Sequence, residues 1–142
     1  MEENKSWIEL LEERIIDSNR VDNCDDCHEF SKYLNEIVTS IFNIEKLNGR
    51  NFFYNFTEGK VIQLEVYKTR FLIIIDDFER VISIKVSRDV DRLDDITVGV
   101  IRVNDKEFIS VEDGNQAKFT RWHLEELLKT TFSSMVQKES LV

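Results

Sequence analysis

Hydrophobic and polar residues follow two different periods along the chain, and the change of period divides it into three parts. Up to residue 47, apolar residues recur every three or four positions, which predicts helices. From residue 51 to residue 111 the period is two, as in half-buried strands. After residue 116 the helical period returns. The pattern therefore predicts two N-terminal helices, a sheet and a C-terminal helix.

The first predicted helix covers residues 4–19. Trp7, Ile8, Leu11 and Ile15 fall on one side of it, and carboxylates occupy the opposite side. This is the pattern of a surface helix that packs one face on a core. We expect the four apolar residues to be buried.

The second predicted helix follows a polar turn at residues 21–26 and extends to about Leu47. It carries a regular apolar stripe, consisting of Cys27, Phe30, Leu34, Ile37, Ile41 and Ile44. Steps of three and four residues are typical of a helix that packs along a seam. We expect Asn48-Gly49 to end the helix with a left-handed residue.

The middle of the chain contains five or six expected strands. The central one is the apolar run Phe71 to Ile75, which stops at Asp76-Asp77, and the others lie at residues 52–56, 62–66, 82–86, 96–103 and 107–111. We expect turns at Glu58-Gly59 and Asn104-Asp105, the latter as a two-residue hairpin turn. Short connections require antiparallel neighbours, so these strands form a meander.

The last helix is expected to begin at about Gln116 or Thr120 and to end near Gln137. The fold class that follows is α+β, a single two-layer domain over residues 1–142 with the helices on one face of an antiparallel sheet. Within the central strand, Leu72 and Ile74 point away from Phe71, Ile73 and Ile75. Either these two residues form an apolar patch on an uncovered face, as at many interfaces, or a terminal helix crosses over and buries them.

Composition narrows the class of protein. The 142 residues carry a formal net charge of −9, which argues against direct binding of nucleic acid or of anionic lipid, because both require a basic surface. The longest apolar run is five residues, far below the roughly 20 of a membrane span. We expect a cytoplasmic protein without a membrane segment. Richness in Ile, Asn, Lys, Phe and Glu suggests a bacterial or phage genome rich in A and T.

Cys24-Asp25-Asp26-Cys27-His28 has the outline of a motif. C-x-x-C-H is the attachment sequence of c-type haem, which requires export, and C-x-x-C at a helix start is also a redox motif. The intervening aspartates disfavour a thiolate and so work against redox activity. A zinc site would need His123 as fourth ligand. We expect Cys27 to continue the apolar stripe, Cys24 to be an ordinary thiol, and no cofactor or metal to be bound.

Three further groups of polar residues are candidates for chemistry. Asp89, Asp91, Asp94 and Asp95 lie in one acidic loop that does not have the ligand spacing of an EF-hand. Asp76 and Asp77, with Glu65 and Lys68, distantly resemble the carboxylate-and-lysine metal sites of nucleases, although no basic groove for DNA accompanies them. His123 lacks a Ser or Cys nucleophile in a recognisable setting.

These observations lead to three hypotheses. The first is a non-catalytic binding protein, such as an inhibitor, an immunity-type protein or an adaptor, which covers a basic, nucleic-acid-handling surface of another protein. Its binding residues are then Asp76, Asp77, Asp89, Asp91, Asp94, Asp95, Leu72 and Ile74. The second is a small-molecule-binding or metal-binding domain or enzyme, with Glu65, Asp76, His123 and Cys24 in a pocket between sheet and helices. The third is a structural homodimer formed through the sheet.

Overall fold

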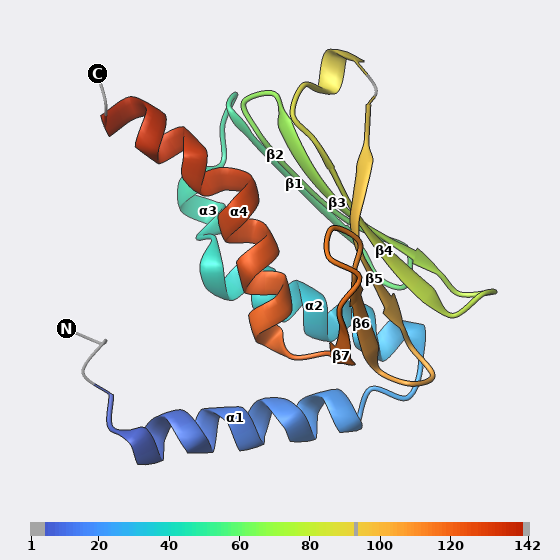
Figure 1. Cartoon of the computed structure of the whole chain (residues 1–142). Coiled ribbons are helices and arrows are strands. Elements are labelled where there is room, and N and C mark those ends of the chain that lie inside the picture. Colours follow the sequence, from blue (N-terminus) through green and yellow to red (C-terminus); the bar gives the residue numbers. More distant parts are fainter. Residues whose placement is uncertain (1–4, 93, 141–142) are drawn as a thin grey trace.

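In the computed structural model, which describes residues 5–92 and 94–140, seven strands form one antiparallel sheet and helices form a second layer (Figure 1). The elements are α1 (Trp7–Asp22), α2 (Cys27–Ile41), α3 (Ile44–Leu47), β1 (Phe52–Thr57), β2 (Val61–Val66), β3 (Thr69–Asp76), β4 (Val81–Ser87), β5 (Ile96–Arg102), β6 (Glu107–Ser110), β7 (Gln116–Lys118) and α4 (Arg121–Ser140), with a short 3₁₀ helix at Val90–Arg92. The α+β class and the antiparallel meander are confirmed.

The order of the strands across the sheet is the order of the sequence, β1 to β7. One strand more is present than the five or six expected. The additional strand, β7, is three exposed residues long and pairs with β6. Three residues, Gln116, Ala117 and Lys118, are too few to establish a period of two, so no local pattern predicted this strand. The last helix begins at Arg121, one residue after Thr120, the later of the two expected starts.

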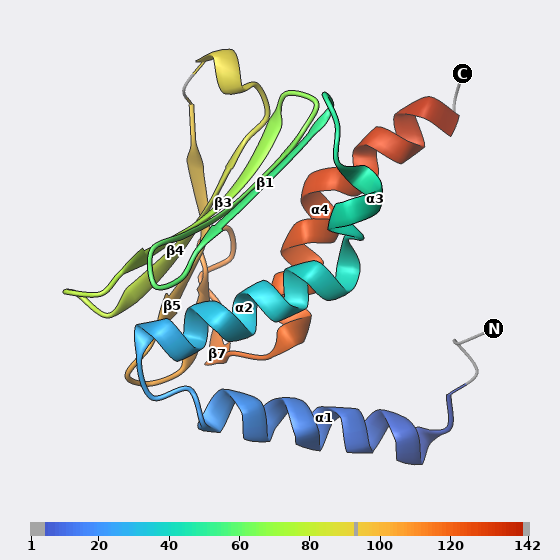
Figure 2. The ribbon, with the colours of Figure 1, turned by 180° about the vertical axis from the view of Figure 1, so that it is seen from behind.

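Helices α2 and α4 cover one face of the sheet, and no helix of the described residues lies on the other face (Figures 1 and 2). Residues along β3 alternate accordingly: Phe71, Ile73 and Ile75 are buried, whereas Leu72 and Ile74 are partly exposed. The same alternation occurs in β2 and β4. The core lies between this sheet face and the buried sides of α2 and α4, as the pleat of a half-covered sheet requires.

The predicted second helix is interrupted. Phe42 is extended (φ −104°, ψ 126°) and ends α2, and Asn43 accepts a hydrogen bond from the Lys46 amide at 3.1 Å to begin the single turn of α3. The helical seam is correct from Cys27 to Ile37 but not at Ile41, which is 44% exposed. An asparagine side chain that caps the next turn competes with the continuing helix, and here the cap prevails.

Two predicted turns differ in detail. Gly49 does not adopt a left-handed conformation, because the chain after α3 leaves in an extended conformation at Asn48 (φ −55°, ψ 124°). The β5–β6 connection spans four residues, from Val103 to Lys106, rather than two, since Arg102 pairs with Glu107. Lys106 supplies its positive φ of 53°. The turn at Glu58-Gly59 is confirmed, with Gly59 at φ 75°.

Gly99 allows a close approach within the core. A register shift between β4 and β5 leaves Val98 without a partner, and Gly99 lies opposite Ile84. A Cβ atom on residue 99 would lie 2.6 Å from the ring of Phe108. The absence of a side chain at residue 99 therefore lets the Phe108 ring pack over the backbone of β5.

We predict that Gly99→Ala destabilises the protein by roughly 1–3 kcal/mol, because the added methyl group overlaps the Phe108 ring and forces the core to move. Urea unfolding followed by circular dichroism measures the change. Gly49→Ala is the matched control, since a Cβ there meets no atom closer than 3.9 Å. Equal stability of the two variants would show that the ring moves aside without cost.

Candidate interaction surface

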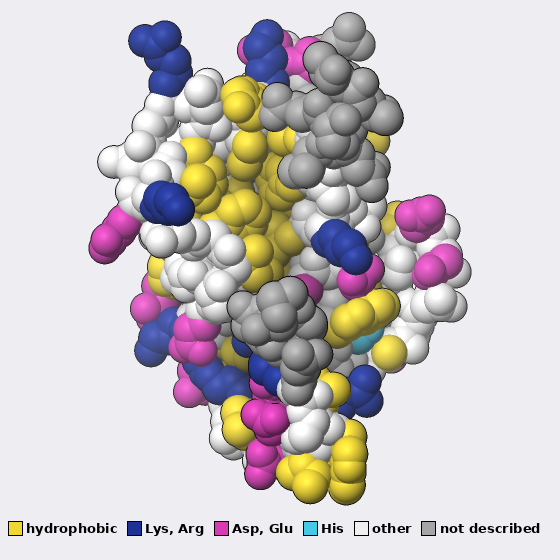
Figure 3. All heavy atoms as spheres, turned by 90° about the vertical axis from the view of Figure 1, so that its left-hand side faces the viewer, with side chains coloured by type: hydrophobic (Ala, Val, Ile, Leu, Met, Phe, Trp, Pro, Cys, Tyr) yellow, Lys and Arg dark blue, Asp and Glu magenta, His cyan; other side chains and the backbone are white. Residues whose placement is uncertain are grey.

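Two hollows lie side by side along α4, at the side of the molecule where α4 ends. The first has a volume of about 260 Å³ and is lined by the end of α2 and by α4, with Ile41, Phe42, Glu125, Leu128, Lys129, Phe132 and Ser133. The second, about 490 Å³, is lined by the β2–β3 turn, the end of β4 and α4, with Tyr67, Lys68, Thr69, Arg88, Ser134 and Met135. We call the two hollows together the α4 groove. Figure 3 shows a hollow with an apolar floor on this side of the molecule.

Aromatic rings form the base of the groove. Phe132 packs edge-on against Phe42, with ring centroids 5.9 Å apart, and also contacts Phe71 at 6.3 Å. Phe42 contacts Phe52 of β1 at 6.2 Å. Phe42 is the extended residue that ends α2, and its ring packs in this cluster. The break after α2 therefore helps to form the base of the groove. An apolar base of this kind favours an apolar ligand.

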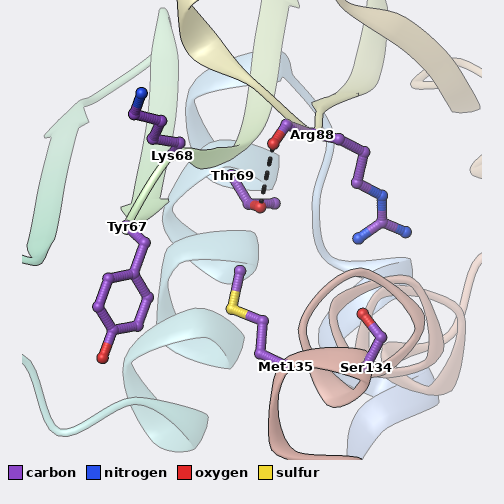
Figure 4. Close-up of a pocket in the computed structure, with 6 residues that line it drawn as sticks. All are labelled: Tyr67, Lys68, Thr69, Arg88, Ser134 and Met135. Carbon is purple, nitrogen blue, oxygen red and sulfur yellow. Dashed lines mark hydrogen bonds between the residues drawn. The ribbon is translucent and has the colours of Figure 1, made fainter. Parts of the chain in front are cut away.

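The polar groups around the groove are mostly engaged with the protein itself. Arg88 donates a hydrogen bond to the Thr131 carbonyl at 2.5 Å and so ties β4 to α4, and the Arg88 carbonyl accepts from Thr69 (Figure 4). Lys68 forms an ion pair with Asp91 at 2.8 Å. Lys129 is exposed and has no ion-pair partner among the described residues. Among the described side chains, the groove offers one available cation at its rim, Lys129, and no cluster of groups suited to chemistry.

Tyr67 stands at the mouth of the second hollow in a strained conformation. It occupies the β2–β3 turn with φ 55°, a left-handed value that disfavours residues with a large side chain, and its side chain is 65% exposed. Figure 4 shows its ring and the Met135 side chain on the same side of the hollow. Strain of this kind often marks a functional position. A glycine or asparagine would relieve the strain but would remove the ring.

Helix α1 is anchored through its last two turns. Asp17 accepts hydrogen bonds from the Tyr33 hydroxyl and, at 3.0 Å, from the Arg121 amide. Arg20 pairs with Glu36 at 2.7 Å and lies over the Tyr33 ring, 5.3 Å from its centroid. Of the sixteen residues of α1, Val21 is the buried one. The end of the helix is thus fixed to α2 and to the start of α4.

The first ten residues of α1, 7–16, which we call the first half of α1 for short, make no such contacts with described residues, and here the expectation of a buried stripe is wrong. Trp7, Ile8, Leu11 and Ile15 are 72%, 50%, 48% and 51% exposed, and Leu10 and Ile16 are exposed as well. Burying the exposed area of these side chains in a complex would contribute about 1 kcal/mol for each of the six. The first turn is nevertheless well formed, because Ser6 and Glu9 make a capping box. These hydrogen bonds from Ser6 hold the pKa of Glu9 below its usual value.

The uncovered face of the sheet is a second, flatter surface. Val61, Ile74, Ser83, Val100 and Ile109 pair in one row across five strands, and all five are partly exposed. Leu72 lies beside this row, so of the two alternatives for Leu72 and Ile74 the structure has the one in which no described helix crosses over to bury them. Because the side chains of this row are only partly exposed, the face is less accessible than the first half of α1.

The six predicted binding carboxylates do not form one surface. Asp76 and Asp77 lie at one end of the β3–β4 hairpin and the other four at the opposite end, which separates the groups by about 20 Å. Each carboxylate also has a local partner, namely the Glu79 amide for Asp76, the Cys27 thiol for Asp77, the Asp91 amide for Asp89, Lys68 for Asp91, Ser87 for Asp94 and Arg70 for Asp95. These contacts stabilise turns and the 3₁₀ segment.

The cysteines are buried, as expected for Cys27, and both are free thiols. Burial raises the pKa of each thiol to about 11, and for Cys27 the hydrogen bond to Asp77 acts in the same direction. The Cys24 thiol also donates to the Arg20 carbonyl at 3.3 Å. High pKa values and burial make both thiols poor nucleophiles.

The two histidines lie in different environments. His123 stacks on Phe108 with ring centroids 4.7 Å apart, and its Nδ1 accepts a hydrogen bond from the Thr120 amide at 3.0 Å at the start of α4. Burial lowers its pKa. His28 is exposed and faces Glu58. Among the described residues, no three His, Cys, Asp or Glu side chains converge in a way that holds a metal ion.

The residues of the proposed pocket between sheet and helices are not brought together. Glu65 lies on the uncovered face, opposite Arg70, and bonds to Gln63. Asp76 is at the end of β3. Cys24 lies in the turn between α1 and α2, and His123 lies in the first turn of α4 against Phe108. Lys68 immediately precedes β3 and Asp76 is the last residue of β3, so the length of the strand separates them. The nuclease-like arrangement therefore does not form either.

Sequence reasoning missed the groove, Tyr67 and Phe78. Phe78 is 93% exposed in the turn between β3 and β4. Both aromatic residues occupy tight turns, where Gly, Asn and Asp are the usual residues. A large aromatic residue at such a position was the available signal. The groove itself left no local signal, because its walls come from segments far apart in the sequence.

The chain matches no family model, no curated protein and no solved structure. No helix in the described part of the chain has the length and apolar character needed to cross a membrane. The interpretation of the surface therefore depends on its own geometry.

We predict that both native cysteines react with Ellman's reagent at pH 8 more than about 100-fold more slowly than an exposed thiol, because a pKa of about 11 leaves few thiolates at that pH. Stopped-flow absorbance measures the rates, with Ser134→Cys as the exposed reference. Both native thiols should become fully reactive in denaturant. A native thiol that reacts at the reference rate contradicts this assignment and reopens the redox hypothesis.

Proposed function

We propose that this protein is a non-catalytic protein-binding domain whose α4 groove takes an apolar helical segment of another polypeptide. The observation that supports this function is the groove itself, an open hollow with an aromatic base and no convergent reactive groups among the described residues. Grooves of this kind bind the apolar side of an amphipathic helix at positions separated by three and four residues.

The width of the sheet favours a helix as the ligand. Seven strands about 4.8 Å apart span about 29 Å, whereas two packed helices about 10 Å wide cover about 20 Å. Helix α1 does not lie on the sheet (Figure 1). The helical layer therefore has room for about one more helix, and the α4 groove borders that space.

The proposal keeps the class of the first hypothesis and changes its surface. The six carboxylates stand at two ends of a hairpin and have local partners, so the proposed binding site is the groove and not these residues. Leu72 and Ile74 remain a second candidate surface on the uncovered face. The enzyme hypothesis loses its support, because Glu65, Asp76, His123 and Cys24 do not share a pocket.

Selection from a displayed library of random 16-residue peptides tests this function directly. We expect enrichment of amphipathic helical sequences, and we expect Ser133→Arg to weaken their binding at least about tenfold, because the arginine fills the first hollow. Thr130→Arg is the matched control, since residue 130 is exposed on α4 but does not line the groove. Fluorescence anisotropy gives the dissociation constants. Failure to enrich any peptide, or equal binding to both variants, argues against a groove that binds helices.

Tyr67→Asn should separate stability from binding. We expect it to raise the free energy of unfolding by about 1 kcal/mol, because asparagine tolerates the left-handed conformation that strains tyrosine. We expect the same variant to bind the selected peptides more weakly, since the ring at the mouth of the groove is lost. Tyr67→Phe keeps both the ring and the strain and should change neither property. Urea unfolding and anisotropy measure the two effects, and a Tyr67→Asn variant with unchanged binding would remove Tyr67 from the site.

A further inference from the structure

From the two unpartnered apolar surfaces of this chain we infer that the helical segment bound in the α4 groove is the first half of α1 from a second copy of the same chain. This inference rests on the proposed function and names its partner. Two identical chains then exchange their N-terminal helices and form a closed dimer.

The two surfaces are complementary in kind. The first half of α1 is an amphipathic helix whose apolar side is exposed, with Trp7, Leu11 and Ile15 at helical spacing. The groove is an apolar hollow suited to such a side. A helix of sixteen residues in water owes most of its stability to packing of its apolar face. For the first half of α1, no described residue of its own chain supplies that packing.

In this structure α1 does not line the groove of its own chain. Asp17 is fixed to the Arg121 amide at the start of α4, and Lys118 pairs with Asp22 at 2.5 Å. Phe132, at the base of the groove, lies eleven residues further along α4, about 16 Å from Arg121. The anchor therefore holds the end of α1 at the start of α4, whereas the aromatic base of the groove lies further along α4.

Both surfaces are visible from one side of the molecule. Figure 3 shows the apolar hollow and, at the lower end of the same view, apolar side chains over α1. When two copies meet through this side with a two-fold axis across it, the α1 helix of each copy faces the groove of the other. Such a contact uses the same residues twice and closes, so it stops at a dimer.

The charges agree with this pairing. The polar side of α1 is acidic, with Glu9, Glu12 and Glu13, and the rim of the groove carries Lys129, which has no ion-pair partner among the described residues. Like-charge contacts between two chains of net charge −9 oppose association in general. A local contact between acidic helix and basic rim offsets this repulsion and fixes the orientation of the helix.

Complementation between two defective variants tests the exchange. Leu11→Gln/Ile15→Gln weakens the helix and leaves the groove intact, whereas Ser133→Arg blocks the groove and leaves the helix intact. In sedimentation velocity we expect the native chain to have twice the monomer mass of 16.9 kDa and each variant to be monomeric. An equimolar mixture should form a heterodimer, because one intact helix and one intact groove remain. Thr130→Arg, on the same helix but outside the groove, is the matched control and should stay dimeric.

The outcomes separate this inference from the function it rests on. A native chain that is monomeric at about 100 μM, while selected peptides still bind the groove, overturns the exchange and leaves the proposed function intact. A dimer that Ser133→Arg does not affect, or variants whose mixture stays monomeric, also overturns it. If Ser133→Arg alters neither self-association nor peptide binding, both proposals fail. For a native dimer, peptides should bind the Leu11→Gln/Ile15→Gln variant at least about tenfold more tightly, because its groove is free.

Discussion

The burial of only one face of a wide sheet is the constraint on which the rest of this structure depends. Strands β2, β3 and β4 place every second residue on the covered side, and these residues meet α2 and α4 in one core. Two helices are too narrow for the sheet, and the third long helix packs elsewhere. The groove and the exposed first half of α1 follow from this mismatch in width between sheet and helices. The partly exposed row follows from the burial of only one face.

The sheet was predictable because its signal is local. Alternation in residues 61–87 fixes which side chains face the core, and the separation of Leu72 and Ile74 from Phe71, Ile73 and Ile75 follows directly from the pleat. The start of α2 was equally clear, since Asp26 accepts a hydrogen bond from the Glu29 amide at 2.8 Å and the stripe begins at Cys27. These features depend on residues within one turn or one strand.

The rest depends on contacts that no local pattern contains. The stripe of α1 predicts an amphipathic helix correctly, but the same stripe serves equally for packing inside the chain or against another chain. The end of α2 is decided by Asn43 and by a ring of Phe42 that packs on Phe132, ninety residues away. For the candidate site, residue type was a poor guide. The carboxylates and cysteines were the candidates, but the carboxylates contact other groups of the chain and the cysteines are buried. The apolar groove, in contrast, is assembled from four segments.

The strand order has a consequence for how the chain acquires its structure. Each strand pairs with the strand made immediately before it, so the meander can grow one hairpin at a time, with small losses of loop entropy at each step. Helix α4 comes last and contributes Leu124, Leu128 and Phe132 to the core. Until the ribosome has released those residues, the sheet lacks half of its cover. The nascent chain is therefore most exposed to aggregation after β7 has emerged and before α4 has, when the apolar face is complete and that helix is still missing.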